Sequence, residues 1–148
     1  MIVFKITLSI LGDDFFPSKL PNINEMRLRM VDSFNPTDER SADSEYGFGS
    51  IDYMHNDIFV KDDILEFEED FVKFIEIHHT IFEEYMAKDY HIFTEVYYSG
   101  YQCNFEILSL SFLNRLSLLN LSIAYPVSVY KMKKKEIKRL LDKSTHWQ

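Results

Sequence analysis

Every second residue in the stretch MIVFKITLSIL, residues 1–11, is large and apolar, and Lys5, Thr7 and Ser9 stand among the residues between them. The apolar positions are Ile2, Phe4, Ile6, Leu8 and Ile10. A period of two is typical of a β-strand with one buried face. The turn sequence Gly12-Asp13-Asp14 follows, so we expect the strand to end there and other elements to cover one of its faces.

Residues 62–88 give the strongest helix signal in the chain. Apolar side chains recur there every three or four residues, which is typical of an amphipathic helix with one buried side. Asp63 and Glu66 have the spacing of a capping box, and the acids of the first turn suit the positive end of the helix dipole. Thr80 and Glu83 repeat the capping spacing, so we expect a break or kink near residues 78–80.

Weaker patterns complete the expected order of elements. In chain order they are a helical turn near Pro17, strands over 25–34 and 46–54, a hairpin of two strands over 92–98 and 102–108, a helix from Ser109 or Ser111 through Leu119, a strand over 121–130 and a basic amphipathic helix over 133–143. Residues 35–45 show no apolar periodicity and indicate a polar loop. Pro126 lacks an amide donor, which places the strand over 121–130 at a sheet edge or a bulge.

Strands in hairpin order with short helices among them predict a single α+β domain. We expect a mostly antiparallel twisted sheet with helices packed on one face and an added C-terminal basic helix. The chain has 148 residues, a mass of 17.7 kDa and 46% hydrophobic residues, which suits one core and leaves no room for two. Residues 1–130 form the body in this prediction, and residues 131–148 form a basic helix or tail of the same domain.

The charge is acidic overall but unevenly distributed. The 16 Lys and Arg against 24 Asp and Glu give −8, which disfavours nucleic acid or an anionic membrane as the main partner and favours a basic protein. Residues 131–148 hold seven cations and two acids, net +5, so the first 130 residues carry −13. The basic tail either pairs with the acidic body or meets something else.

Cysteine usage and the N-terminal residues predict a cytoplasmic protein. Cys103 is the one cysteine, so the chain cannot form an intramolecular disulfide. The apolar run over residues 1–11 is interrupted by Lys5, has no small-residue cleavage site and is too short to span a bilayer.

No motif for catalysis, a metal or a cofactor stands out. Glu76, His79 and Glu83 share one side of the expected helix, but a helical dimetal site needs a second Glu-x-x-His pair, which the chain lacks. We therefore expect this string to be a solvated helix side, and we predict no metal site and no cofactor. Cys103 has no catalytic signature around it and is expected to be structural.

Two groups of residues are candidates for binding a partner. The first is the densest acidic cluster, whose members are Asp62, Asp63, Glu66, Glu68, Glu69 and Asp70. Such a cluster either caps and solvates the helix or speeds encounter with a basic protein. The second group is Tyr97, Tyr98 and Tyr101 around the expected hairpin turn, where tyrosine either anchors an interface or covers one end of the core.

Two segments resemble a large bacterial family of small α+β domains of unknown function. Residues 8–20, LSILGDDFFPSKL, are similar to the strand, the Gly-x-x-Phe-x-Pro turn and the short helix that open that family. Residues 112–130 are similar to its last leucine-rich helix and final strand. Some members resemble immunity proteins of polymorphic-toxin systems, so the resemblance implies a binding protein; it carries no catalytic residue to this chain.

These observations favour a non-enzymatic protein-binding domain, such as an immunity-type inhibitor that occludes a basic toxin. One alternative is a small metal- or ligand-binding enzyme with His55, His79 or His91 in its site. Another is an assembly or nucleic-acid module acting through residues 131–148. A homodimer stays open in each case.

Overall fold

The computed structural model describes residues 1–55, 59–61, 67–105 and 108–145. Strand β1 (Ile2–Gly12) lies at the centre of the main sheet and runs antiparallel to its neighbours on both sides. On one side it pairs with β5 (Gly49–His55) and β6 (Val60–Lys61), and on the other with β7 (Asp89–Tyr98). The strand expected over residues 1–11 is thus confirmed.

Two further segments of the main sheet lie outside this centre. Strand β2 (Leu28–Phe34) pairs with β5, and a bulge interrupts their register between Met30 and Asp32. On the opposite side, β8 (Ser122–Ala124) and β9 (Val127–Lys131) lie one after the other along β7. Over the described residues the strand order is β2-β5-β1-β7-β8, with β6 beside β1 and β9 beside β7.

Pro126 separates β8 from β9 at the edge of the sheet, as its missing donor predicts. Its carbonyl accepts a hydrogen bond from the Thr94 N–H at 2.9 Å, so the ladder with β7 resumes at once. Both short strands run parallel to β7. Helix α2 (Leu110–Ser117) makes the crossover that this parallel pairing needs.

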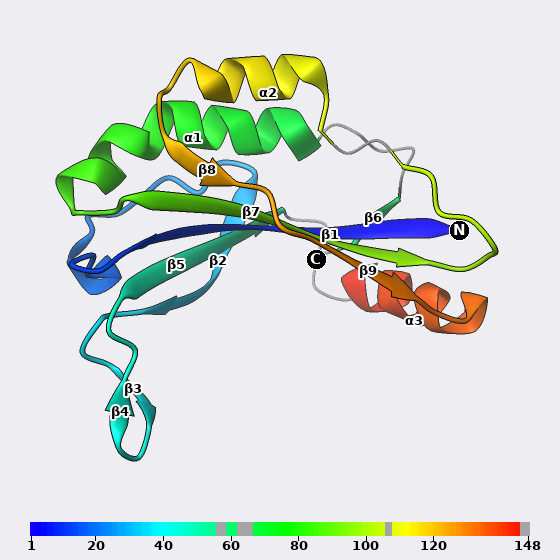
Figure 1. Ribbon diagram of the computed structural model, residues 1–148, viewed down its shortest axis with the longest axis horizontal. Coiled ribbons are helices and arrows are strands. Elements are labelled where there is room, and N and C mark those ends of the chain that lie inside the picture. Colours follow the sequence, from blue (N-terminus) through cyan, green and yellow to red (C-terminus); the bar gives the residue numbers. More distant parts are fainter. Residues whose placement is uncertain (56–58, 62–66, 106–107, 146–148) are drawn as a thin grey trace.

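Helices α1 (Phe67–Glu84) and α2 form a layer over one face of the sheet (Figure 1). Phe4, Leu8 and Ile10 of β1 point into this layer and are fully buried, and Phe74 and Phe82 of α1 meet them there. The expected α+β class, a mostly antiparallel sheet with helices on one face, is confirmed.

The C-terminal helix α3 (Lys134–Thr145) lies on the other side of the sheet (Figure 1). Ile137 is fully buried in α3, and Val3 is fully buried although it points away from the main core. Nearby, the Tyr97 ring stacks on Tyr130 at 5.2 Å and meets Phe59 edge-on at 5.8 Å. A second, small apolar cluster thus lies between α3 and the sheet.

The polar loop expected over residues 35–45 is wrong in part. It contains a small hairpin of β3 (Glu39–Ser41) and β4 (Ser44–Glu45), whose residues are all exposed. The hydroxyls of Ser41 and Ser44 lie 2.8 Å apart across its turn. Because the hairpin projects into solvent and buries no face, its sequence has no apolar alternation to reveal the strands.

The expected hairpin of strands over 92–98 and 102–108 is also wrong, because residues 102–105 form no strand; residues 106–107 lie outside the described part of the chain. After β7 the described chain leaves the sheet, and Phe105 packs edge-on against Phe4 at 5.8 Å. The position beside β7 is taken by β8 and β9, which come more than twenty residues later. Local turn signals favour the nearest pairing and do not contain this distant one.

The expected break near residues 78–80 does not occur, because α1 is continuous from Phe67 to Glu84. The His78 ring packs edge-on against Phe74 at 4.7 Å, and its Nε2 lies 2.8 Å from the Asn24 carbonyl oxygen. These tertiary contacts hold the helix together where the local capping spacing suggests an end. Within the described ranges, no helix combines the length and apolar composition that crossing a membrane requires.

Candidate protein-binding surface

The acidic cluster predicted at the start of α1 is only partly within the described residues. Asp62, Asp63 and Glu66 lie outside them. Glu68 and Glu69 stand in the first turn of α1, followed by Asp70, where carboxylates suit the positive end of the helix dipole. All three have partners within the chain, so their first role is structural.

Asp70 points into the protein rather than to solvent. Its side chain is 13% exposed, and its Oδ2 lies 2.7 Å from His55 Nε2 and 3.4 Å from Arg27 Nε. Because His55 belongs to β5, this contact fixes the start of α1 on the sheet. Asp70 is therefore poorly placed to meet a partner directly.

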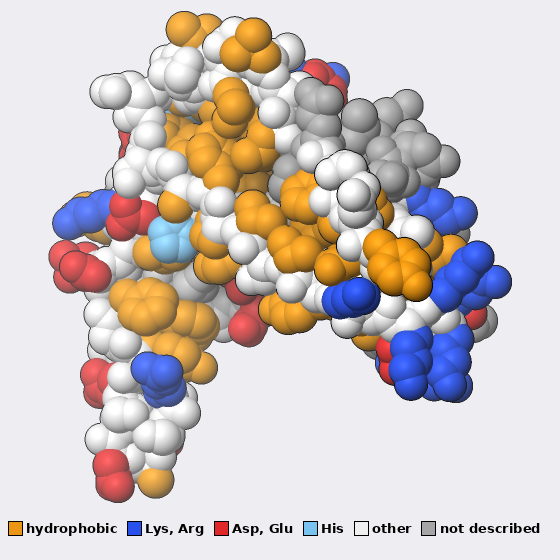
Figure 2. Space-filling view, turned by 45° about the vertical axis from the view of Figure 1, so that its right-hand side comes forward, with side chains coloured by type: hydrophobic (Ala, Val, Ile, Leu, Met, Phe, Trp, Pro, Cys, Tyr) orange, Lys and Arg blue, Asp and Glu red, His pale blue; other side chains and the backbone are white. Residues whose placement is uncertain are grey.

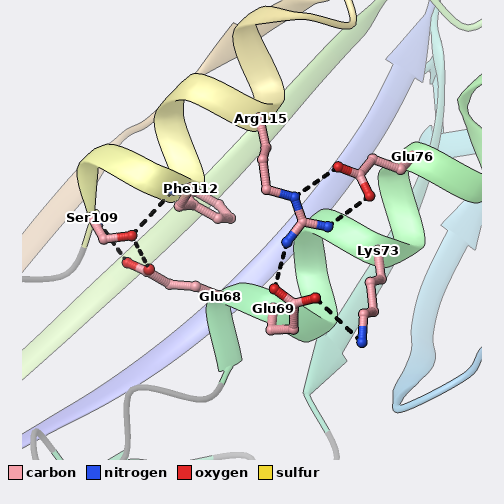
Figure 3. A network of polar contacts seen from close by, with 7 residues as sticks. All are labelled: Glu68, Glu69, Lys73, Glu76, Ser109, Phe112 and Arg115. Atoms are coloured by element: carbon pink, nitrogen blue, oxygen red, sulfur yellow. Dashed lines mark hydrogen bonds and ion pairs between the residues drawn. The ribbon is translucent and has the colours of Figure 1, made fainter.

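Glu68 fastens α2 to α1 through Ser109. The Glu68 carboxylate accepts hydrogen bonds from the Ser109 N–H at 2.8 Å and from its hydroxyl at 2.6 Å (Figure 3). The Ser109 hydroxyl oxygen in turn accepts a hydrogen bond from the Phe112 N–H at 3.1 Å, so Ser109 is the N-cap of α2. Of the two predicted cap residues, Ser109 is thus the one used.

Arg115 of α2 joins two carboxylates of α1. Its Nε and one terminal nitrogen donate to both oxygens of Glu76 at 2.9 and 2.7 Å, and the other nitrogen donates to Glu69 (Figure 3). The ammonium group of Lys73 lies 3.2 Å from Glu69. Hydrogen bonds from Lys73 and Arg115 lower the pKa of Glu69, and those to Glu76 and Glu69 raise the pKa of Arg115. This network sets the spacing and direction of the two helices.

The outward side of the two-helix layer keeps both negative charge and apolar side chains. Four acids of α1, Glu69, Glu76, Glu83 and Glu84, stand there against Lys73 and Arg115, which leaves −2. Three large apolar side chains are exposed among them: Ile77 at 61%, Leu110 at 74% and Leu118 at 84%. We call this the α1–α2 surface; it consists of Glu69, Lys73, Glu76, Ile77, Glu83, Glu84, Leu110 and Leu118.

The three predicted tyrosines do not form one cluster. Tyr97 is half-buried between Phe59 and Tyr130, and its hydroxyl donates to Glu95 at 3.0 Å. Burial and this hydrogen bond raise the pKa of Tyr97. Tyr98 is half-buried and follows it in the strand, so it points to the opposite face. Only Tyr101 is fully exposed, in the loop that leads from β7 toward α2 at the same end as the start of α1 (Figure 1).

The side chains of Glu76, His79 and Glu83 do not form a shared metal-binding arrangement. Glu76 is bound to Arg115, while His79 Nδ1 lies 3.7 Å from Glu83. Among the described residues, no group of three or more His, Cys, Asp or Glu is placed to hold a metal ion. The cavity between α1 and α2 measures about 130 Å³, whereas small-molecule pockets are typically about 300–1,000 Å³. We therefore assign it no ligand.

Sequence reasoning missed Arg115 and the exposed leucines Leu110 and Leu118. Arg115 has a visible signal, because it is the only Lys or Arg between Lys88 and Lys131. One cation in so long a segment is a good candidate for a specific ion pair. The leucines have no such signal, because the leucine spacing within residues 110–119 does not say which leucines of a short helix face the sheet.

Comparison of the chain with protein-family models, curated proteins and solved structures yields no match. The resemblance to the bacterial family stays a prediction.

Proposed function

We propose that this protein is a non-enzymatic protein-binding domain that occludes a basic protein partner in the cytoplasm, as an immunity-type inhibitor occludes a toxin. The observation that carries the proposal is the α1–α2 surface, where three exposed apolar side chains, Leu110, Leu118 and Ile77, belong to a helix pair whose acids outnumber its bases. Protein interfaces commonly combine apolar anchors with a polar rim. The acidic rim here selects basic partners and disfavours nucleic acid.

Two acids of this surface support the proposal by their position. Glu83 and Glu84 stand in the last turn of α1, which contains no basic residue. The negative end of the helix dipole disfavours carboxylates at this position by roughly 0.3–1 kcal/mol each. The helix dipole therefore does not account for these two acids, and a role in attracting a partner does.

The network of Arg115 supports the proposal from a second direction. Because Arg115 holds Glu69 and Glu76 in place, the two helices present their exposed side chains in one fixed arrangement. A surface that is ordered before binding loses less conformational entropy when a partner docks.

The first experiment identifies what touches the surface. A photo-crosslinking residue is placed at Leu118 in the native cell, with Val31 as the matched control because it is apolar and exposed on a different element, β2. We expect a basic protein to be crosslinked through position 118 and not through 31. Capture of an acidic protein, or equal capture from both positions, would contradict the proposal.

The second experiment measures affinity for the captured protein after purification. We expect Leu118→Ser and Glu84→Lys each to weaken binding, with the effect of Glu84→Lys shrinking as salt screens the charges. Glu84→Lys also removes a charge that the helix dipole disfavours, so the variant should unfold at an equal or higher temperature than the wild type. Weaker binding by a chain of undiminished stability cannot be attributed to misfolding. Unchanged affinity in both variants would exclude this surface.

A further inference from the structure

Two oppositely charged elements project from the sheet on the side away from α1 and α2. The β3–β4 hairpin descends at one end and α3 lies at the other, with a hollowed underside between them (Figures 1 and 2). Residues 38–45 carry four acids and one arginine, net −3. The end of β9 and α3, residues 131–143, carry seven cations and two acids, net +5.

Within the described part of the chain, the acidic body makes no ion pair with the basic tail. Among the described residues, no ion pair joins a lysine or arginine of residues 131–143 to any acid of the body. Helix α3 is held by its buried Ile137, while Lys134, Lys135 and Lys138 stay exposed. Of the two alternatives for the basic tail, pairing with the acidic body is supported by no described ion pair, and these lysines are exposed.

Strand β9 leaves the backbone of one sheet edge open beside these cations. The first and last bonds of its ladder run from Thr94 N–H to the Pro126 oxygen and from Met132 N–H to the Tyr98 oxygen, both at 2.9 Å. The backbone N–H and C=O groups of the even-numbered residues of β9 therefore point toward β7. Those of Val127, Val129 and Lys131 point away from it. Among the described strands β9 pairs only with β7, so this edge can accept another strand.

The hairpin is a strand donor of matching charge. Strands β3 and β4 pair with each other only, within the described chain, and every residue in them is exposed. An isolated two-stranded hairpin is marginally stable in water, and a third strand stabilises it. Its acids Glu39, Asp43 and Glu45 would lie close to the lysines that flank the open edge.

We propose that a second copy of this chain binds here, with the β3–β4 hairpin of each copy added to the β9 edge of the other and its acids set against α3. Because the hairpin and α3 project on the same side from opposite ends, a two-fold axis makes both contacts at once and closes the assembly as a dimer. Net charges of −8 repel the copies at long range, but at physiological salt the Debye length is about 8 Å and the local opposite charges dominate on contact. This surface lies away from the α1–α2 surface and does not depend on the function proposed for it.

Exchanging the charges of the two elements tests the proposal most directly. The mass of the assembly is measured by light scattering or sedimentation at protein concentrations from micromolar to millimolar. One variant carries Glu39→Lys, Asp43→Lys and Glu45→Lys, and the other carries Lys134→Glu, Lys135→Glu and Lys138→Glu. Lys134 and Lys135 stand in the first turn of α3, where glutamate is favoured, and Lys138 is exposed, so the second variant should keep its fold. We expect each variant alone to dimerise at least about tenfold more weakly than the wild type, because like charges then meet.

Mixing the two variants should restore association as a heterodimer, because each lysine-bearing hairpin or helix then faces a glutamate-bearing counterpart. Combining all six substitutions in one chain should restore the homodimer. A wild type that is monomeric throughout the concentration range would overturn the proposal. So would a dimer that both charge variants form as tightly as the wild type does, or variants that stay monomeric when mixed.

A backbone substitution separates strand addition from charge attraction alone. Val129→Pro removes an N–H that faces away from β7, so the ladder inside the chain is kept while the open edge loses a donor. Val129→Thr keeps the N–H and serves as the control. We expect Val129→Pro to weaken dimerisation at least about tenfold and Val129→Thr to leave it nearly unchanged, with circular dichroism and thermal melts confirming that both fold. Equal dimerisation by the two variants would exclude pairing at this edge. Binding of a partner to the α1–α2 surface is measured separately, so either proposal can fail alone.

Discussion

Gly49 begins β5 where the backbone after β1 passes against it. A Cβ at Gly49 would lie 1.7 Å from the carbonyl oxygen of Phe15, and one at Gly12 would lie 2.4 Å from that of Met86. Phe15 itself is fully buried and meets Phe82 edge-on. The Gly-x-x-Phe-x-Pro turn, which suggested a family resemblance, thus has a clear structural purpose: it allows close backbone contacts and places one aromatic ring in the core.

Gly49→Ala should therefore be severely destabilising, and Gly47→Ala provides the matched control. At Gly49 the backbone itself must move, and we expect a loss of roughly 3 kcal/mol or more in the free energy of unfolding. At Gly47 nothing lies within 4 Å of an added Cβ, but the φ of +77° is strained for alanine and should cost about 1 kcal/mol. Chemical denaturation of both variants measures the difference. Equal losses would show that the close approach at Gly49 relaxes easily.

Asp52 makes stability depend on pH. Burial raises the pKa of Asp52 and Asp32 adds to the rise, although hydrogen bonds from Ser9 and Ser50 lower it. The folded chain therefore holds this proton more tightly than the unfolded chain. The stabilising contribution of Asp52 is complete below the ordinary pKa of aspartate and is lost as the pH rises through the raised value.

Asp52→Asn, which resembles the protonated side chain, should melt like the wild type in acid and above it at neutral pH. Thermal melts across this range test the expectation, with Asp13→Asn as the control because Asp13 is exposed in a turn. A constant difference in melting temperature at all pH values would contradict the assigned cause.

At the scale of elements, the sequence predicted what depends on local chemistry. The period of β1, the amphipathic α1 and the break at Pro126 follow from side-chain spacing and a missing donor, and the structure has them. The parallel pairing of β7 with β8 and β9 depends on a contact between distant segments, so turn signals near Gly100 favoured a hairpin that does not form. For the same reason Glu68 and Glu69 could be predicted as an acidic helix start, while their partners Ser109 and Arg115 could not.

The start of α2 is set by Ser109, and the neighbouring serine gives a control. Ser109 caps the helix and also donates to Glu68, whereas Ser111 is exposed. We expect Ser109→Ala to lower the free energy of unfolding by about 1–2 kcal/mol and Ser111→Ala to change it by less than about 0.5 kcal/mol. Denaturant titrations compare the two. A large effect at Ser111 would place the cap at the other serine.

At the scale of the whole molecule, the apolar side chains divide between two faces of one sheet. The main core lies under α1 and α2, and the smaller cluster with Val3 and Ile137 lies under α3. The sequence predicted the basic helix and its apolar stripe, but not the face on which it docks, because an amphipathic pattern does not name its partner surface. A helix of 12 residues is marginal by itself in water, so α3 depends on this docking.

Ile137→Ala should therefore release α3 while the body stays folded. The substitution removes the fully buried anchor of the helix, and burial of such a side chain is worth about 2 kcal/mol or more. We expect amide hydrogen exchange to rise over residues 134–143 and to stay unchanged in β1, because local opening needs less free energy than global unfolding. Lys138→Ala is the control, since Lys138 is exposed on the same helix. If exchange in β1 rises as much as exchange in α3, the two apolar clusters unfold as one unit and α3 is part of the main cooperative structure.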